Sequence, residues 1–322
     1  MERSVIVLSK LPKLLGHLKS KVPNVAFHRV TPGSQEAVSE LEKTEILIAD
    51  ADLLASHLDH LKSLKWAQLT WAGVDKLAAH LAGRKIPYQI SRYSDERFGF
   101  AMSEYTVSHI FNFERDQRQQ YENEKNKIWY KGGKIEEHRL ICDLTIGILG
   151  IGSIGKHVAQ ILSSLGATVW GLSRTLPKEK ISCLERHVTT KELPEILRVS
   201  DYIVSVLPST QETNGLLYGD VLEHCKEKRP VFMNIGRGNT IRETDIIRAI
   251  ENRWISAAIL DVFQEEPLPP SSRLWSIPEV TISPHISGVT NSIGIAEAFA
   301  KNHVKYLNGE EIPNKFDANR GY

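Results

Sequence analysis

The sequence predicts an α/β protein of two Rossmann-like domains, each built on a doubly wound parallel sheet. Short β-branched runs alternate with helical stretches along the whole chain, which is typical of parallel strands joined by crossover helices. A long helix-like segment, residues 100–125, separates an earlier series of these units from a later one. The 322 residues are enough to bury two cores. We expect one domain at 101–290 and a discontinuous one at 1–100 plus 291–322, which the helical tail completes.

The strands follow from the apolar runs in chain order. In the first series the runs are SVIVL, VAFHRV, EILIAD and WAQLTW, with helical segments such as PKLLGHLKS and ADLLASHLDHLKSL between them. In the second series they are TIGILG, TVWGLS, YIVSVL, VFMNI, ISAAIL and VTISP.

Composition argues against several classes of function. Lys plus Arg total 40 and Asp plus Glu total 39, so the net charge of +1 gives no basic surface for nucleic acid or an anionic membrane. No apolar run approaches the roughly 20 residues of a membrane span. The three cysteines are far apart, so they suggest neither a disulfide framework nor a metal site. We expect a protein of the reducing cytoplasm.

A glycine-rich turn lies between two of the predicted strands. The segment Gly150-Ile151-Gly152-Ser153-Ile154-Gly155 follows TIGILG and opens an apolar-periodic helix, after which TVWGLS begins. Alone, G-x-G-x-x-G is a weak signal, but the strand–turn–helix context is the one that dinucleotide binding requires. The glycines permit a tight turn, and a pyrophosphate would lie at the positive end of the helix. We therefore expect residues 101–290 to form the dinucleotide-binding domain and residues 1–100 plus 291–322 to form the substrate domain.

The next strand ends at Ser173, Arg174 and Thr175, where NAD-binding proteins usually place an acidic residue against the ribose 2′-hydroxyl. A guanidinium pairs with a 2′-phosphate and hydroxyls donate to it, whereas a carboxylate would repel it. These residues therefore favour NADP(H), with NAD(H) as the alternative. Arg174 as a solvated surface residue is the other interpretation.

Four further polar side chains follow predicted strands. Arg237 lies in VFMNIGRGNT, Asp261 and Glu266 in ILDVFQEEPLP, and His285 in VTISPHISGVT. Ligands of open parallel sheets bind at the carboxyl ends of the strands. We therefore expect these side chains at the same edge as the glycine turn.

At these motifs the chain resembles the D-isomer-specific 2-hydroxyacid dehydrogenases, over nearly its whole length. The resemblance rests on LTIGILGIGSIG, LPSTQETNGLL, NIGRGNTIRETDIIRAIE, LDVFQEEPLP and SPHISG. Arg237, Glu266 and His285 match the family's Arg, Glu and His, with spacings of 29 and 19 residues.

The chemistry of a keto-acid reduction suits these three residue types. His285 is the natural proton donor because histidine titrates near neutrality. Glu266 would fix the imidazole tautomer, and Arg237 would polarise the carbonyl and hold the carboxylate. Each residue could instead have only a structural role, and Glu265 competes with Glu266 for the place beside the histidine.

The resemblance implies further ligand contacts. For the cofactor they come from Leu207, Pro208, Thr213, Ile235, Gly236, Arg237, Asp261, His285 and Gly288, with Asp261 near the nicotinamide amide. For the substrate they come from Arg237, His285 and the backbone N–H groups of the turn Ala72-Gly73-Val74. Trp71 would either line the substrate pocket or pack in the core. Met102 would either cover the substrate or fill a gap in the core.

No cluster of basic residues adjoins WAGVD, which favours a small, unphosphorylated 2-keto acid such as glyoxylate, hydroxypyruvate or pyruvate. We therefore expect an NADPH-dependent reductase similar to glyoxylate/hydroxypyruvate reductases, and the resemblance implies a homodimer formed through the nucleotide domain. The alternatives are an NAD-dependent dehydrogenase of D-lactate or formate type and a nucleotide-sensing protein like the corepressors of this fold.

Overall fold

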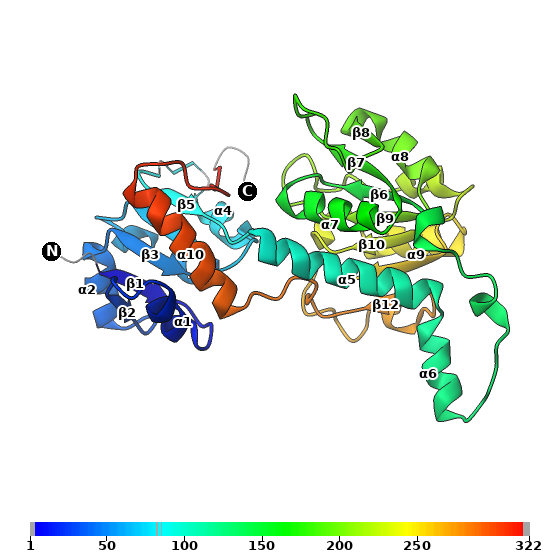
Figure 1. Cartoon of the computed structure of the whole chain (residues 1–322), viewed down its shortest axis with the longest axis horizontal. Helices are drawn as coiled ribbons and strands as arrows, with labels where there is room; N and C mark the ends of the chain where they lie inside the picture. Colours follow the sequence, from blue (N-terminus) through cyan, green and yellow to red (C-terminus); the bar gives the residue numbers. More distant parts are fainter. Residues whose placement is uncertain (1–3, 82, 85, 318–322) are drawn as a thin grey trace. The chain divides into compact units, whose positions relative to one another are not determined.

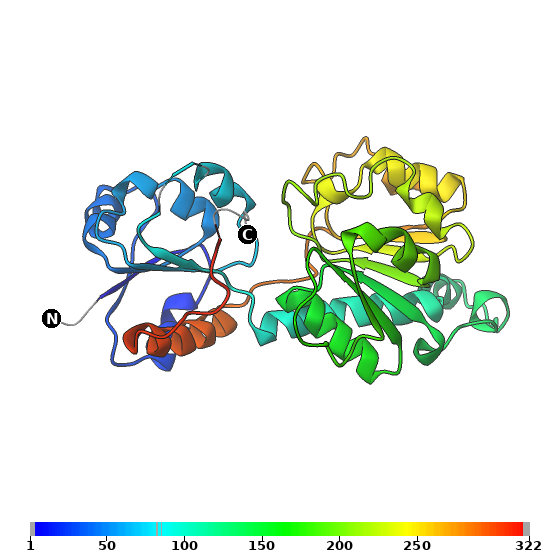
Figure 2. The same ribbon diagram turned by 90° about the horizontal axis from the view of Figure 1, so that it is seen from above.

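Two parallel β-sheets, one in each of two units, organise the chain (Figure 1). The computed structural model describes residues 4–81, 83–84 and 86–317. One unit comprises residues 1–98 with 289–322, and the other comprises residues 99–288. In each unit helices lie on both faces of the sheet (Figure 2). The two boundaries between these units lie two residues before those expected from the sequence.

The sheet of the first unit has the order β2-β1-β3-β4-β5. Its parallel strands are β1 (Val5–Leu8), β2 (Phe27–Arg29), β3 (Ile46–Ala49), β4 (Trp66–Leu69) and β5 (Gln89–Ser91). Every residue of β1, β3 and β4 is buried, as expected for strands that helices cover on both sides. The helices are α1 (Leu14–Lys21), α2 (Gln35–Lys43), α3 (Ala51–Ala55), α4 (Asp75–Leu81) and α10 (Ser292–Leu307), with a 3₁₀ turn, η1 (Leu58–His60).

Helix α10 returns the end of the chain to the first unit, where it lies beside α1. Phe299 of α10 stacks on Trp66 of β4 with ring centroids 5.3 Å apart. Asn302 of the same helix donates to the buried Gln68 at 2.8 Å. These contacts give the tail both an apolar and a polar attachment to the sheet.

The sheet of the second unit has the order β12-β11-β10-β9-β6-β7-β8. Its strands are β6 (Thr145–Leu149), β7 (Thr168–Ser173), β8 (Arg186–Thr189), β9 (Tyr202–Ser205), β10 (Val231–Asn234), β11 (Ala257–Leu260) and β12 (Val280–Ile282). Its helices are α5 (Glu96–Glu114), which begins in the first unit, α6 (Gln117–Lys125), α7 (Ser153–Ser164), α8 (Leu193–Val199) and α9 (Glu243–Glu251). From β6 the chain adds β7 and β8 on one side of the sheet and then crosses to add β9 on the other side. Ligands of open α/β sheets bind at such a switch point.

Short 3₁₀ segments connect the elements of the second unit. They are η2 (Gly133–Ile135), η3 (Ile141–Asp143), η4 (Thr190–Glu192), η5 (Val221–Cys225), η6 (Gly238–Thr240) and η7 (Arg273–Ser276).

Two local expectations were wrong. The segment 100–125 is not one helix, because α5 ends at Glu114 and α6 begins at Gln117, with Asp116 between them at φ 50°. Strands β5 and β8 were not expected from the sequence, and both are short strands at an edge of their sheets. The ten strands that were expected are all present.

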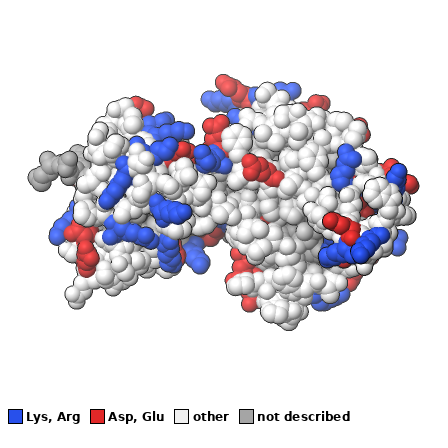
Figure 3. All heavy atoms as spheres, turned by 60° about the horizontal axis from the view of Figure 1, so that its bottom comes forward, with Lys and Arg blue, Asp and Glu red and all other residues white. Residues whose placement is uncertain are grey.

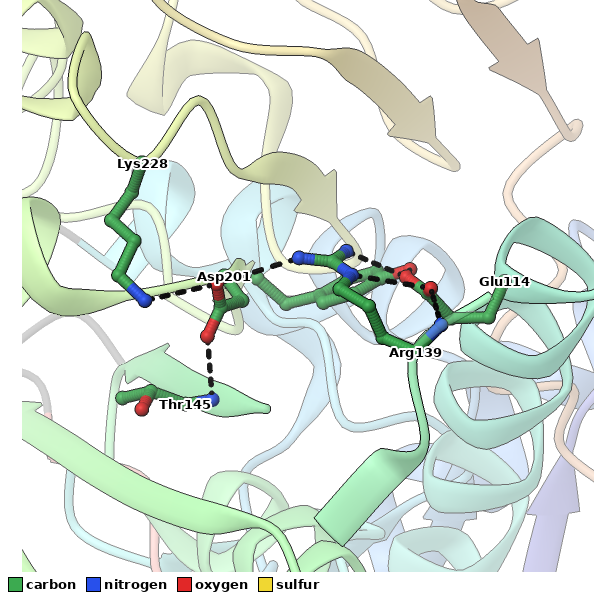
Figure 4. A network of polar contacts seen from close by, with 6 residues as sticks. Glu114, Arg139, Thr145, Asp201 and Lys228 are labelled. Atoms are coloured by element: carbon green, nitrogen blue, oxygen red, sulfur yellow. Dashed lines mark hydrogen bonds and ion pairs between the residues drawn. The ribbon is translucent and has the colours of Figure 1, made fainter. Parts of the chain in front are cut away.

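A polar network joins the elements at the edge of the second sheet where β6 and β9 begin (Figure 4). Arg139 contacts Glu114 at the end of α5 with Nη2–Oε1 at 2.6 Å, and contacts Asp201 with Nη1–Oδ1 at 3.4 Å. Lys228 also contacts Asp201, which accepts the backbone amide of Thr145 at 2.9 Å. This network lies at the end of the strands opposite to the glycine turn, so it supports the fold rather than a ligand.

Acidic and basic side chains both occur on the face shown in Figure 3. Among the described residues, no helix combines the length and the apolar character that crossing a membrane requires.

Candidate active site

The glycine turn connects β6 to α7, as the sequence predicts. The amides of Gly150 and Ile151 both donate to the carbonyl of Leu172 in β7, at 2.9 and 3.1 Å, which fixes the turn against the neighbouring strand. Gly150 has φ 108°, a conformation that favours glycine. A Cβ on Gly155 would lie 1.9 Å from the carbonyl oxygen of Gly150, so only glycine lets the helix pack this closely on the turn. The N-terminus of α7 is thus set where a pyrophosphate can approach it.

Ser173, the last residue of β7, is held in place by hydrogen bonds. Its hydroxyl donates to the carbonyl of Thr175 at 2.9 Å and lies 2.8 Å from His187 Nε2 in β8. Burial lowers the pKa of His187. Its contact with Ser173 holds the end of β7 against β8.

Arg174 contacts an acidic residue from a different part of the chain. Its Nη1 lies 3.2 Å from Oε1 of Glu212, in the loop after β9. The Glu212 backbone amide, the Thr210 hydroxyl and Arg174 together hold the pKa of the Glu212 carboxyl below its usual value. No sequence pattern indicates this pair, because the two residues are 38 positions apart.

The loop after β9, with Leu207, Pro208 and Thr213, is tightly folded. The Thr213 hydroxyl donates to the carbonyl of Pro208 at 2.5 Å and accepts the amide of Thr210 at 2.9 Å. Leu207 is buried. The Asn239 side chain donates to Ser209 at 2.7 Å, which links this loop to the one that carries Arg237.

Arg237 follows β10 after Ile235 and Gly236, in a turn that Asn234 stabilises. Asn234 is 1 % exposed; its Oδ1 accepts the amide of Gly236 at 3.2 Å and its Nδ2 donates to the carbonyl of Arg237 at 3.1 Å. A Cβ on Gly238 would lie 1.9 Å from the backbone of Phe263, so the glycine permits close approach of the Glu266 loop. The half-buried Arg237 places its Nη1 2.8 Å from the carbonyl of Gly236.

The structure brings Glu266 and His285 into direct contact. Nδ1 of His285 lies 2.7 Å from Oε2 of Glu266, and Oε1 of Glu266 accepts the amide of Phe263 at 2.9 Å. The Glu266 side chain is 35 % exposed and that of His285 is 48 % exposed, so water or a ligand can reach the pair. Among the described residues, Glu266 rather than Glu265 provides the carboxylate beside His285.

Asp261 organises the loop that carries His285. Its carboxylate is fully buried and accepts the hydroxyl of Ser283 at 2.5 Å and the amides of Ile286 and Ser287, both at 2.8 Å. His285 has φ 55°, an uncommon conformation for a residue with a side chain. The hydrogen bonds that the Asp261 carboxylate accepts hold the loop in this conformation.

Tyr105 of α5 extends this set, because its hydroxyl lies 2.6 Å from Oγ of Ser283. The Ser283 proton is given to Asp261, so Tyr105 is the donor in this contact. Burial raises the pKa of Tyr105 to about 12. The sequence resemblance places the Asp261 carboxylate near the nicotinamide amide. In the structure the carboxylate accepts hydrogen bonds from the loop that carries His285. The second unit ends just after this loop, at Gly288.

The residues expected at the substrate fall in both units. Trp71 and the turn 72–74 follow β4 in the first unit. Trp71 is 38 % exposed, which disagrees with the core-packing alternative, whereas Val74 is buried in the core of that unit. Met102 lies on α5 in the second unit and is 3 % exposed, which agrees with the alternative that it fills the core.

The sequence model of the family "D-isomer specific 2-hydroxyacid dehydrogenase, NAD binding domain" matches residues 107–287. This match covers more than half of the chain. The chain belongs to the D-isomer-specific 2-hydroxyacid dehydrogenases. It is therefore an NAD(P)-dependent oxidoreductase, and the strand–turn–helix at Gly150 and the strand-end residues Arg237, Glu266 and His285 lie within the matched domain.

Solved structures of this dehydrogenase family resemble the whole chain. A family member from Aeromonas salmonicida subsp. salmonicida A449 is 31% identical, with a TM-score of 0.85 over 99% of this chain and 100% of that one. A probable 2-hydroxyacid dehydrogenase from Rhizobium etli CFN 42, in complex with NADP, HEPES and L(+)-tartaric acid, is 26% identical, with a TM-score of 0.83 over 100% of both chains. An NADPH-dependent glyoxylate/hydroxypyruvate reductase from Sinorhizobium meliloti, in complex with NADP and sulfate, is 25% identical, with a TM-score of 0.83 over 99% of each chain.

Within residues 4–81, 83–84 and 86–317, no three His, Cys, Asp or Glu side chains gather closely enough to hold a metal ion.

Proposed function

We propose that this dehydrogenase reduces a small, unphosphorylated 2-keto acid, such as glyoxylate or hydroxypyruvate, to the D-2-hydroxy acid, and that it prefers NADPH to NADH. The observation that carries the proposal is the contact of 2.7 Å between His285 and Glu266. A histidine whose Nδ1 faces a carboxylate keeps its other nitrogen, Nε2, for a substrate.

Each of the three residues has a defined role in this reaction. NADPH, when bound at the Gly150 turn, supplies the hydride. His285 holds a proton on Nε2 and gives it to the keto oxygen, and Glu266 stabilises the imidazolium and fixes its orientation. Arg237 binds the carboxylate and polarises the carbonyl with its planar guanidinium. After the reaction His285 is neutral and takes up a proton from water.

Arg174 supports the preference for NADPH. It follows the strand that ends beside the adenosine ribose in dinucleotide folds, and Ser173 and Thr175 flank it with hydroxyls. The relatives from R. etli and S. meliloti were both solved with NADP. The substrate contacts expected from Trp71 and the turn 72–74, and the expected homodimer, stay predictions.

The test is to follow absorbance at 340 nm with glyoxylate, hydroxypyruvate, pyruvate and bulkier 2-keto acids, each with NADPH and with NADH. We expect the highest kcat/KM for a two- or three-carbon keto acid with NADPH, and D-glycerate as the product from hydroxypyruvate. Higher kcat/KM with NADH and pyruvate would favour a D-lactate-type enzyme. No turnover with any keto acid would contradict the proposal and favour a nucleotide sensor.

A further inference from the structure

The acidic residue that NAD-binding proteins usually carry at the end of the second strand is absent from β7, but a carboxylate is present nearby in space. Glu212 Oε1 lies 3.2 Å from Arg174 Nη1. The carboxylate therefore reaches the residue that the proposed function assigns to the 2′-phosphate of NADPH.

The loop that carries Glu212 is tightly folded. The amide of Thr210 donates to the Thr213 hydroxyl at 2.9 Å. The loop is also bound to the Arg237 loop, because Gly215 donates to the carbonyl of Asn239 at 3.0 Å. These bonds fix the backbone that carries Glu212, and the Glu212 backbone amide, the Thr210 hydroxyl and the contact with Arg174 together lower the pKa of its carboxyl.

We propose that Glu212 moderates the preference of this enzyme for NADPH by competing with the 2′-phosphate for Arg174. A 2′-phosphate must take the guanidinium from Glu212 and bear the repulsion of its charge. The 2′-hydroxyl of NADH can donate to the Glu212 carboxylate while Arg174 stays paired. Glu212 thereby weakens NADPH binding and supports NADH binding. This inference rests on the proposed role of Arg174.

The exposure of the pair sets the size of the effect. The Arg174 side chain is 42% exposed and that of Glu212 is 56% exposed, so water screens both charges. Exposed pairs of this kind are weak, and we expect changes in affinity of about two- to fivefold rather than orders of magnitude.

The experiment is a fluorescence titration of the whole enzyme with NADPH and with NADH at one ionic strength. The variants are Glu212→Gln, Arg174→Gln and both together. Glu179→Gln is the matched control, because Glu179 is an exposed acid in the loop that also carries Arg174 and its removal changes the net charge equally. Glu212→Gln should lower the Kd for NADPH about two- to fivefold and raise the Kd for NADH.

The outcomes separate this inference from the proposed function. If Glu212→Gln changes both Kd values alike, or no more than Glu179→Gln does, the inference is overturned. If Arg174→Gln in that case still raises the Kd for NADPH and not that for NADH, the proposed preference for NADPH stands without a role for Glu212. If neither substitution is selective, the role of Arg174 and the inference both fail. Keto-acid turnover does not enter the titration, so a wrong substrate assignment leaves these results readable.

Discussion

The backbone amide of His285 donates to the carbonyl oxygen of Asp261 at 2.9 Å, so the proposed proton donor is attached to the end of the neighbouring strand. The buried Asp261 carboxylate then accepts the amides of the next two residues, Ile286 and Ser287. A non-glycine residue with positive φ keeps its conformation only where its surroundings determine it. We infer that Asp261 positions His285 through the backbone.

Replacing Asp261 by Asn should therefore affect turnover. The NH₂ group of an asparagine cannot accept a hydrogen bond, so the backbone amide of Ile286 or of Ser287 would lose its acceptor. We expect this to lower the free energy of unfolding by about 1–3 kcal/mol. Displacement of His285 should lower kcat by up to about a hundredfold. Kinetics and urea unfolding test this. Asp245→Asn is the control, since Asp245 is a buried acid of the same unit that pairs with Arg248. A raised KM for the cofactor with unchanged kcat would instead support a contact with the nicotinamide amide.

Glu266→Gln should lower the rate of reduction. The Glu266 carboxylate, 2.7 Å from His285 Nδ1, fixes the orientation of the imidazole that donates the proton. A neutral amide holds the ring less firmly, so we expect kcat to fall by about ten- to a hundredfold in steady-state kinetics. Glu265→Gln is the matched control, because Glu265 is the adjacent exposed acid. An unchanged kcat in the Glu266 variant would remove Glu266 from this role.

The local features of the site were predictable from the sequence. The Gly150 turn has its apolar strand and periodic helix in consecutive residues, so short-range patterns are sufficient. The shared edge of Arg237, Asp261, Glu266 and His285 follows from the rule that parallel strands end together. The match to the family's Glu-Pro pattern favoured Glu266 over Glu265, and Glu266 is the carboxylate in contact with His285.

Features that depend on tertiary contacts were not predictable. The Arg174–Glu212 pair joins loops after two different strands, and Asn234 stabilises the Arg237 turn from inside the core. Asp116 interrupts the expected helix without a nearby Gly or Pro to signal a stop. Strand β8, Arg186–Thr189, has only one buried residue, so it lacks the apolar run that identifies central strands.

The three cysteines should differ in reactivity. Burial raises the pKa of Cys225 to about 12, and it also raises the pKa of the half-buried Cys183, whereas Cys142 is exposed. Because the thiolate is the nucleophile, a raised pKa together with burial makes Cys225 the least reactive of the three. A thiol-reactive chromophore should therefore label Cys142 first, and Cys225 only after unfolding. The Cys142→Ser variant should lose the fast phase; a fast phase that survives would contradict this order.

The network of Figure 4 should make the stability of the second unit depend on pH. Burial alone would raise the pKa of the Glu114 carboxyl, but hydrogen bonds from Arg139 and from Tyr202, at 2.6 Å, outweigh it and hold the pKa below its usual value. A depressed pKa means that Glu114 stabilises the fold above the unfolded-state pKa, and that this contribution is lost as the pH falls through the folded-state pKa.

Glu114→Gln should therefore lower the free energy of unfolding by about 1–3 kcal/mol at pH 7, because a hydrogen bond to a charged group is replaced by a weaker one. The difference from the unchanged protein should shrink steadily as the pH is lowered from about 5, where free carboxyls begin to protonate. Urea unfolding at a series of pH values measures it. Glu122→Gln, which removes an exposed acid paired with Lys125 on α6, should change stability little at any pH. If the two free energies of unfolding, of the Glu114→Gln variant and of the unchanged protein, differ by the same amount down to pH 3, the charge of Glu114 does not stabilise the fold.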